Sequence, residues 1–91
     1  MFSLVTPQRF LRRARKFLKK HPDLRGQFTQ IIADLQHDPY APHLTFHHLS
    51  GKLKGIQAVS ITGSYRITLT IFVTEKEIVL LDVGSHDEVY F

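Results

Sequence analysis

The sequence predicts an α+β domain in which an antiparallel helical hairpin packs on one face of a four-stranded, mainly antiparallel sheet. Apolar residues recur with a helical period over residues 7–37 and alternate with polar residues in the segments of residues 55–91. Short connections join the segments within each half, which makes consecutive elements antiparallel. No linker or repeat divides the chain, so residues 1–91 are expected to form a single domain.

A short strand over residues 2–5 is expected first, followed by a helix. Thr6 is expected to cap this helix and Pro7 to occupy its first turn. The helix is expected to end at His21-Pro22, because proline disfavours the α conformation in the residue before it. Its apolar stripe consists of Phe10, Leu11, Ala14, Phe17 and Leu18.

A second helix follows, with Asp23 as its expected cap and Asp38-Pro39 as its end. Its apolar stripe consists of Leu24, Phe28, Ile31, Ile32 and Leu35. Proline, serine and glycine then mark a loop over residues 38–54. Three strands are expected after it, over residues 55–62, 65–73 and 77–83.

The composition limits the classes of function. The chain has no cysteine, which excludes disulfides, thiolate metal sites and a cysteine nucleophile. No apolar run is long enough for a signal peptide or a membrane span, so we expect a cytoplasmic protein that does not bind a membrane. The formal net charge is +4, which favours a polyanionic or acidic partner.

Seven of the twelve basic residues lie on the first helix, outside its apolar stripe. They are Arg9, Arg12, Arg13, Arg15, Lys16, Lys19 and Lys20. A face of this kind is most often simply solvated, and the alternative is a surface that binds RNA phosphates or an acidic partner.

Residue types that catalyse reactions concentrate in residues 47–55 and 84–90, with Arg66 between these segments. In a meander, the loop before its first strand and the segment after its third can meet at one end of the sheet. They would then combine imidazoles, ammonium groups, a guanidinium and a phenol. This set suits RNA cleavage, because the 2′-hydroxyl of RNA is itself the nucleophile and the protein supplies only base, acid and cations.

Each of these residues also has an ordinary structural interpretation. Lysines are usually surface residues, and Tyr90 can be an aromatic packed at an edge. His43, His47 and His48 have a spacing that zinc ligands can show, but no further ligand motif accompanies them. We therefore expect neither a metal site nor a cofactor.

Taken together, three segments resemble the RelE/ParE superfamily, the toxins of type II toxin–antitoxin pairs. The segments are HHLSGKLKG at residues 47–55, GSYRI at residues 63–67 and VGSHDEVY at residues 83–90. The resemblance covers nearly the whole chain and implies a RelE-like fold and a cognate antitoxin as partner. RelE-like and YafQ-like members cut mRNA in the ribosomal A site, which implies that the ribosome with its mRNA is a second partner and that the basic helix meets rRNA.

The resemblance also implies roles by position. Lys52 and Lys54 resemble lysines that contact the substrate phosphates, and Arg66 resembles an arginine that stabilises the transition state. His86 matches the proposed general-acid histidine of YafQ-like toxins, and Tyr90 matches an aromatic residue that stacks on or orients the cleaved nucleotide.

The resemblance offers more than one candidate for the general base. His47 matches the first histidine of the YafQ-like HxLxG pattern and is the first choice, with Lys52 or Lys54 as the second. At Ser60 and Ser64, YafQ-like members carry a histidine and an aspartate, and the C-terminal helix of some relatives is not expected. Two alternatives stay open. One is a ParE-like toxin that binds gyrase without nuclease activity, although ParE members lack the catalytic cations present here. The other, which the departures at Ser60 and Ser64 favour, is a catalytically degenerate toxin that only binds its antitoxin.

Overall fold

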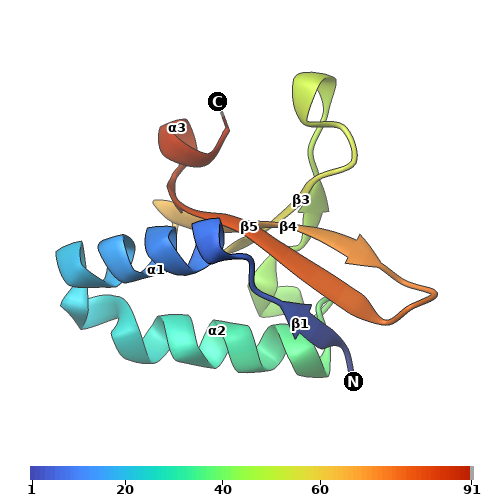
Figure 1. The fold of residues 1–91 in the computed structure, drawn as a ribbon, viewed down its shortest axis with the longest axis horizontal. Helices are drawn as coiled ribbons and strands as arrows, with labels where there is room; N and C mark the ends of the chain where they lie inside the picture. The colour runs from blue at the N-terminus through green and yellow to red at the C-terminus, as the bar shows by residue number, and fades with distance from the viewer. Residues whose placement is uncertain (91) are drawn as a thin grey trace.

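The alternating segments of the sequence form one mixed, five-stranded sheet with two helices on one face (Figure 1). This computed structural model describes residues 1–90. The strand order is β1-β5-β4-β3-β2, where β1 is parallel to β5 and every other pair is antiparallel. The strands are β1 (Ser3–Val5), β2 (His47–His48), β3 (Gln57–Ser60), β4 (Tyr65–Phe72) and β5 (Glu77–Ser85).

The prediction of four strands was short by one. The additional strand, β2, lies in the predicted loop and pairs His47 with Ala58 and His48 with Gln57. Its two residues are too few to show an alternating pattern, so the pairing arises only when β3 is present as a template. The edge position of β2 leaves both of its histidines exposed.

The two long helices are α1 (Gln8–Lys20) and α2 (Arg25–His37), and their apolar stripes face the sheet. Leu35 of α2 and Ile67 and Leu69 of β4 are fully buried in the shared core. Leu44, in the short 3-10 turn η2 (Pro42–Leu44), completes this core and anchors the connection that leads to β2. No helix within residues 1–90 has the length and apolar character needed to cross a membrane.

Both helices end as predicted but begin differently. His21 leaves the α conformation before Pro22, and Asp38 is extended before Pro39. Pro7, rather than Thr6, occupies the N-cap position of α1, where its carbonyl accepts the first helical hydrogen bond.

The predicted cap of α2 was also wrong. Asp23 lies inside a 3-10 turn, η1 (Pro22–Leu24), and makes no cap hydrogen bond, while Leu24 holds the N-cap position. Proline at the start of η1 is compatible with helical geometry, so the chain is already helical before Asp23 can cap it.

Alternation along β4 separates the core face of the sheet from the opposite face. The side chains of Tyr65 and Ile67 pack in or against the core, so Arg66 between them points to the opposite face. Two structures rise on that side, away from α1 and α2: the loop with the 3-10 turn η3 (Gly51–Leu53) and the short helix α3 (His86–Val89) (Figure 1). The predicted functional segments therefore stand on one side of the sheet.

Candidate active site

Four of the six predicted catalytic residues come together around Tyr90. The Tyr90 hydroxyl lies 3.5 Å from Nε2 of His47, and its ring meets that of His86 edge to face at 4.3 Å between centroids. Arg66 is near enough for its charge to affect the titration of this phenol. The cluster thus draws on β2, β4 and the segment that begins with α3, which lie far apart in the sequence.

Burial and charge act in opposite directions on the Tyr90 phenol. Partial burial raises the pKa of Tyr90 above its ordinary value of about 10, while the positive charge of Arg66 lowers it by a smaller amount. The net effect is upward, so this phenol remains protonated at neutral pH. The Tyr90 hydroxyl can therefore donate a hydrogen bond to an unprotonated Nε2 of His47.

His47 is held from the other side by the main chain. Its Nδ1 lies 2.8 Å from the carbonyl oxygen of Thr45, two residues earlier. The ring is exposed, so a substrate can reach it. Its neighbour His48 points to the opposite face of the strand, where its ring contacts Phe46.

Arg66 is oriented by Ser60, its partner across β3 and β4. Nη1 of Arg66 donates to Oγ of Ser60 at 3.0 Å, and that oxygen lies 2.6 Å from Oγ1 of Thr45. Sequence reasoning treated Ser60 only as the loss of a histidine and did not consider Thr45. The pairing could have been found in the sequence, because a turn at residues 62–64 sets a strand register that places Ser60 opposite Arg66.

The residues after β5 are held in place by a capping box. Ser85 accepts a hydrogen bond from the backbone N–H of Glu88 at 3.3 Å, and its own N–H donates to Oε1 of Glu88 at 2.8 Å. Hydrogen bonding to the carboxylate from the Ser85 backbone N–H, and to a lesser extent from the Ser85 side chain, lowers the pKa of the Glu88 carboxyl, and the more distant charges of Lys20 and Arg13 add to the effect. The resulting helix α3 corrects the expectation that the chain lacks a C-terminal helix.

Gly84 allows this arrangement because it has no side chain. A Cβ at that position would lie 2.8 Å from Oε1 of Glu88 and 3.2 Å from its Cβ. The glycine also pairs with Arg66 across β4 and β5. The same residue therefore gives Glu88 room to cap α3 beside the site.

The remaining two predicted catalytic residues, Lys52 and Lys54, are not part of this cluster. They are exposed on the η3 loop, which is bounded by two glycines in the left-handed region, Gly51 at φ 65° and Gly55 at φ 92°. Within residues 1–90, neither ammonium group forms a hydrogen bond or an ion pair with the protein. Both are available to an anion that enters from the side of the sheet on which α3 stands.

The three histidines with zinc-like spacing point in different directions. Nε2 of His43 binds the carboxylate of Asp34 at 2.7 Å, and this contact is the main cause of the lowered pKa of Asp34. His48 lies 3.4 Å from the amide of Gln57. Within the described part of the chain, no group of three or more histidine and acidic residues has the geometry to hold a metal ion.

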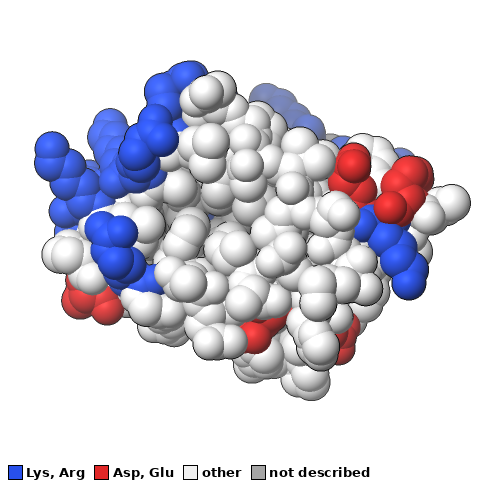
Figure 2. Space-filling view, turned by 60° about the horizontal axis from the view of Figure 1, so that its bottom comes forward, with Lys and Arg blue, Asp and Glu red and all other residues white. Residues whose placement is uncertain are grey.

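Six of the seven basic residues predicted to bind RNA are exposed along α1, whereas Arg13 is half-buried. Nε of Arg13 donates to the largely buried Asp82 at 2.7 Å, and Arg9 lies 3.7 Å from the same carboxylate. Arg13 therefore has a structural role that sequence reasoning did not assign. Figure 2 shows basic side chains gathered at the end of the molecule where α1 meets α2.

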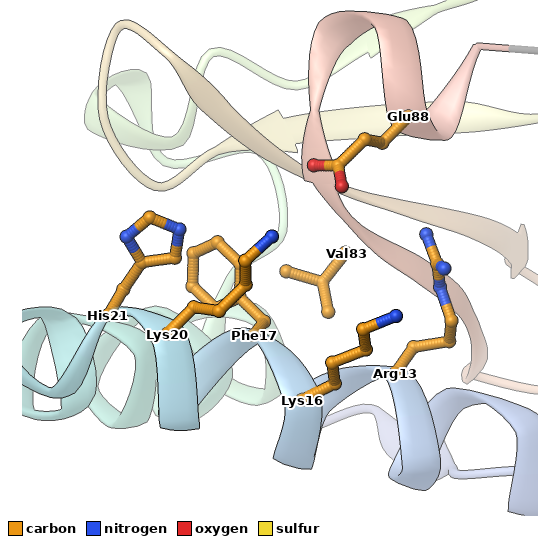
Figure 3. Close-up of a pocket in the computed structure, with 7 residues that line it drawn as sticks. All are labelled: Arg13, Lys16, Phe17, Lys20, His21, Val83 and Glu88. Atoms are coloured by element: carbon orange, nitrogen blue, oxygen red, sulfur yellow. The ribbon is translucent and has the colours of Figure 1, made fainter.

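A small polar pocket of about 60 Å³ lies between α1 and the segment with α3 (Figure 3). Arg13, Lys16 and Lys20 of α1 line it on one side, and Glu88 reaches into it from the other. It is separate from the Tyr90 cluster, so the basic helix and the candidate active site are neighbouring but distinct parts of the surface.

No family model and no curated protein sequence matches the chain, whereas solved structures match it over nearly its full length. A copper-bound mutant toxin from Helicobacter pylori is 26% identical, with a TM-score of 0.79 over 98% of this chain and 99% of that one. YafQ from E. coli is 13% identical, with a TM-score of 0.82 over all of both chains. A YoeB–YefM complex from Staphylococcus aureus contains a chain that is 10% identical, with a TM-score of 0.72 over 94% of this chain and 98% of that one.

The matches to the Helicobacter pylori toxin and to YafQ cover 98–100% of this chain and 99–100% of the matched chains, so the likeness extends over the whole fold. The fold of this chain is therefore that of these toxins, as the three segments that resemble the RelE/ParE superfamily led us to expect.

Proposed function

We propose that this protein is the toxin of a type II toxin–antitoxin pair and that it is an endoribonuclease that cuts mRNA in the ribosomal A site. The observation that carries the proposal is the cluster of His47, Arg66, His86 and Tyr90 on the sheet face opposite the helices. The similarity to toxins, including one in a toxin–antitoxin complex, supports the toxin role.

His47 is the general base in this proposal. It removes the proton from the 2′-hydroxyl, whose oxygen then attacks the adjacent phosphorus. Imidazole is suited to this step because its ordinary pKa of about 6.5 is close to neutrality. The exposure of the ring and its position beside Tyr90 support this role for His47 over Lys52 or Lys54.

His86 is the general acid, and cations stabilise the transition state. His86 protonates the 5′-oxygen as its bond to phosphorus breaks, so the products are a 2′,3′-cyclic phosphate and a 5′-hydroxyl. The guanidinium of Arg66 and the ammonium groups of the η3 loop bind the non-bridging oxygens, where negative charge grows. Tyr90 orients the nucleotide by stacking on its base.

The exposed basic residues of α1 bind the phosphates of rRNA in this proposal, and they place the site against the mRNA. Contacts of this kind weaken as the salt concentration rises, because each neutralised phosphate releases counterions. A cognate antitoxin is the second partner. The positive net charge fits an acidic antitoxin segment that folds when it binds.

The proposal is tested by adding the purified protein to a cell-free translation system and mapping mRNA ends by primer extension. We expect translation to stop and cuts to appear within A-site codons. His47→Gln should reduce the cleavage rate by about 100-fold or more, as expected for the loss of acid–base catalysis. His48→Gln is the matched control, because its ring faces the other side of the same strand, and it should cut like the wild type.

Intact mRNA at saturating protein would contradict the nuclease proposal. A supercoiling assay with DNA gyrase run in parallel then separates the alternatives. Inhibition of gyrase would identify a ParE-like toxin, whereas no effect in either assay would identify a protein that only binds its antitoxin.

A further inference from the structure

We propose that Thr45 is a positioning residue for the site: its carbonyl holds His47 in the tautomer protonated on Nδ1, and its hydroxyl holds Ser60 against Arg66. The first half of this inference concerns the free protein alone. Only its catalytic consequence rests on the proposed function.

The main chain of Thr45 has an unusual conformation. Its φ of 50° and ψ of 45° place it in the left-handed region, which β-branched residues rarely adopt. Thr45 directly follows Leu44, which is fully buried in the core. A strained residue persists only where its surroundings determine its conformation, and here the buried anchor and the hydroxyl bonds of Thr45 do so.

The consequence of this bend is the position of the Thr45 carbonyl beside the imidazole of His47, at 2.8 Å from Nδ1. A carbonyl oxygen can only accept a hydrogen bond, so Nδ1 must carry the proton in the neutral ring. Nε2 is then the unprotonated nitrogen. It is the atom that faces the hydroxyl of Tyr90, and it is therefore the atom available to take a proton from a substrate.

The hydroxyl groups nearby have a fixed direction. The Thr45 hydroxyl donates its one proton to the carbonyl of Leu44 at 2.7 Å. The contact of 2.6 Å between Oγ1 of Thr45 and Oγ of Ser60 must therefore be donated by Ser60.

Ser60 in turn accepts a hydrogen bond from Nη1 of Arg66 at 3.0 Å. Every proton in this chain of bonds thus points from Arg66 towards the carbonyl of Leu44. Through its carbonyl and its hydroxyl, Thr45 orients both the imidazole and the guanidinium. This arrangement links the proposed base to the group proposed to stabilise the transition state.

The tautomer is tested by ¹⁵N NMR of the imidazole rings in the free protein, at a pH of about 8 where an ordinary histidine is neutral. We expect the shifts of His47 to report a proton on Nδ1 in the wild type and in Thr45→Ser, which keeps the hydroxyl. Thr45→Val removes the hydroxyl but keeps the shape, so the bend loses its tether and the Nε2–H tautomer should gain population. A His47 ring protonated on Nε2 in the wild type would overturn the inference. So would an unchanged tautomer of His47 in Thr45→Val.

Ser60→Ala is a second variant that leaves the bend itself intact. It should release Arg66 without changing the tautomer of His47, because the Thr45 hydroxyl still binds Leu44. A changed tautomer in Ser60→Ala would show that Thr45 and Ser60 do not act separately and would overturn the assignment.

Cleavage kinetics test the catalytic consequence. Thr45→Val should reduce kcat by about tenfold to a hundredfold with little change in KM, and Thr45→Ser should restore kcat. An equal fall in kcat in both variants, or a change in KM alone, would contradict a positioning role. If the wild type cuts no RNA, the proposed function fails while the NMR result still decides the tautomer.

Discussion

Replacing Ser85 by alanine should detach α3 from the site while leaving the rest of the fold intact. α3 is a single turn of four residues, closed by a hydrogen bond from the backbone N–H of Tyr90 to the carbonyl of His86 at 3.1 Å. One turn is unfavourable by itself, because it fixes several backbone dihedrals for one bond. The two capping bonds between Ser85 and Glu88 therefore decide whether the turn forms.

The magnitude follows from the bond that the variant removes. Ser85→Ala deletes the side-chain acceptor of the capping box, and the loss of such an N-cap costs about 1 kcal/mol. This free energy lowers the ratio of formed to unformed α3 by about fivefold. α3 contributes only Val89 to the buried apolar residues, so the thermal midpoint of the whole domain should remain near that of the wild type.

Amide hydrogen exchange at Tyr90 measures this change directly. The exchange rate should rise about fivefold in Ser85→Ala, because exchange follows the small unformed population of α3. The rate of RNA cleavage should fall only slightly, because most molecules still have α3 formed. Ser64→Ala is the control, because Ser64 is an exposed serine in the turn before β4. Unchanged exchange at Tyr90 in Ser85→Ala would refute the reasoning that the cap maintains α3.

Four further predictions concern the C-terminal segment and the buried residues. Gly84→Ala should displace the Glu88 side chain and accelerate amide exchange throughout α3, without the loss of any buried apolar group. The folded state lowers the pKa of Glu88, so its carboxylate stabilises α3 at a pH above the ordinary glutamate pKa of about 4.3. This stabilisation should be lost as the pH falls below about 4.3 and through the lowered pKa of the folded state. Glu88→Gln should therefore make amide exchange in α3 less dependent on pH over this range. Leu35→Ala should lower the free energy of unfolding by about 2–5 kcal/mol in a urea titration, whereas Asp82→Ala, which strips Arg13 of its partner, should lower it by about 1–3 kcal/mol.

The helices could be predicted where local stereochemistry determines them. Proline excludes the α conformation from the residue before it, so His21-Pro22 and Asp38-Pro39 mark both helix ends correctly. The first residues of the helices were predicted wrongly, because a side chain can cap a helix only where its own backbone is not yet helical. Around Asp23 the chain is already in a 3-10 turn, so the carboxylate has no cap position to occupy.

The candidate site was only partly predictable from the sequence. Short turns bring β4 and β5 together, so the approach of His86 and Tyr90 to Arg66 follows from the meander. Helix α3 could have been predicted, because Ser85 and Glu88 have the spacing of a capping box. The role of Thr45 could not, since it depends on a left-handed bend that no local pattern around a threonine indicates.

The parallel pairing of β1 with β5 places Ser3 beside Glu77, so the first strand gains its partner only from the last. Closing so long a loop costs entropy before any contact compensates it, which makes folding slow. During synthesis, the pairs that β5 forms with β1 and β4 must also wait until β5 has left the ribosome. The growing polypeptide therefore cannot assemble the cluster of His47, Arg66, His86 and Tyr90 before β5 and the residues that follow it have emerged.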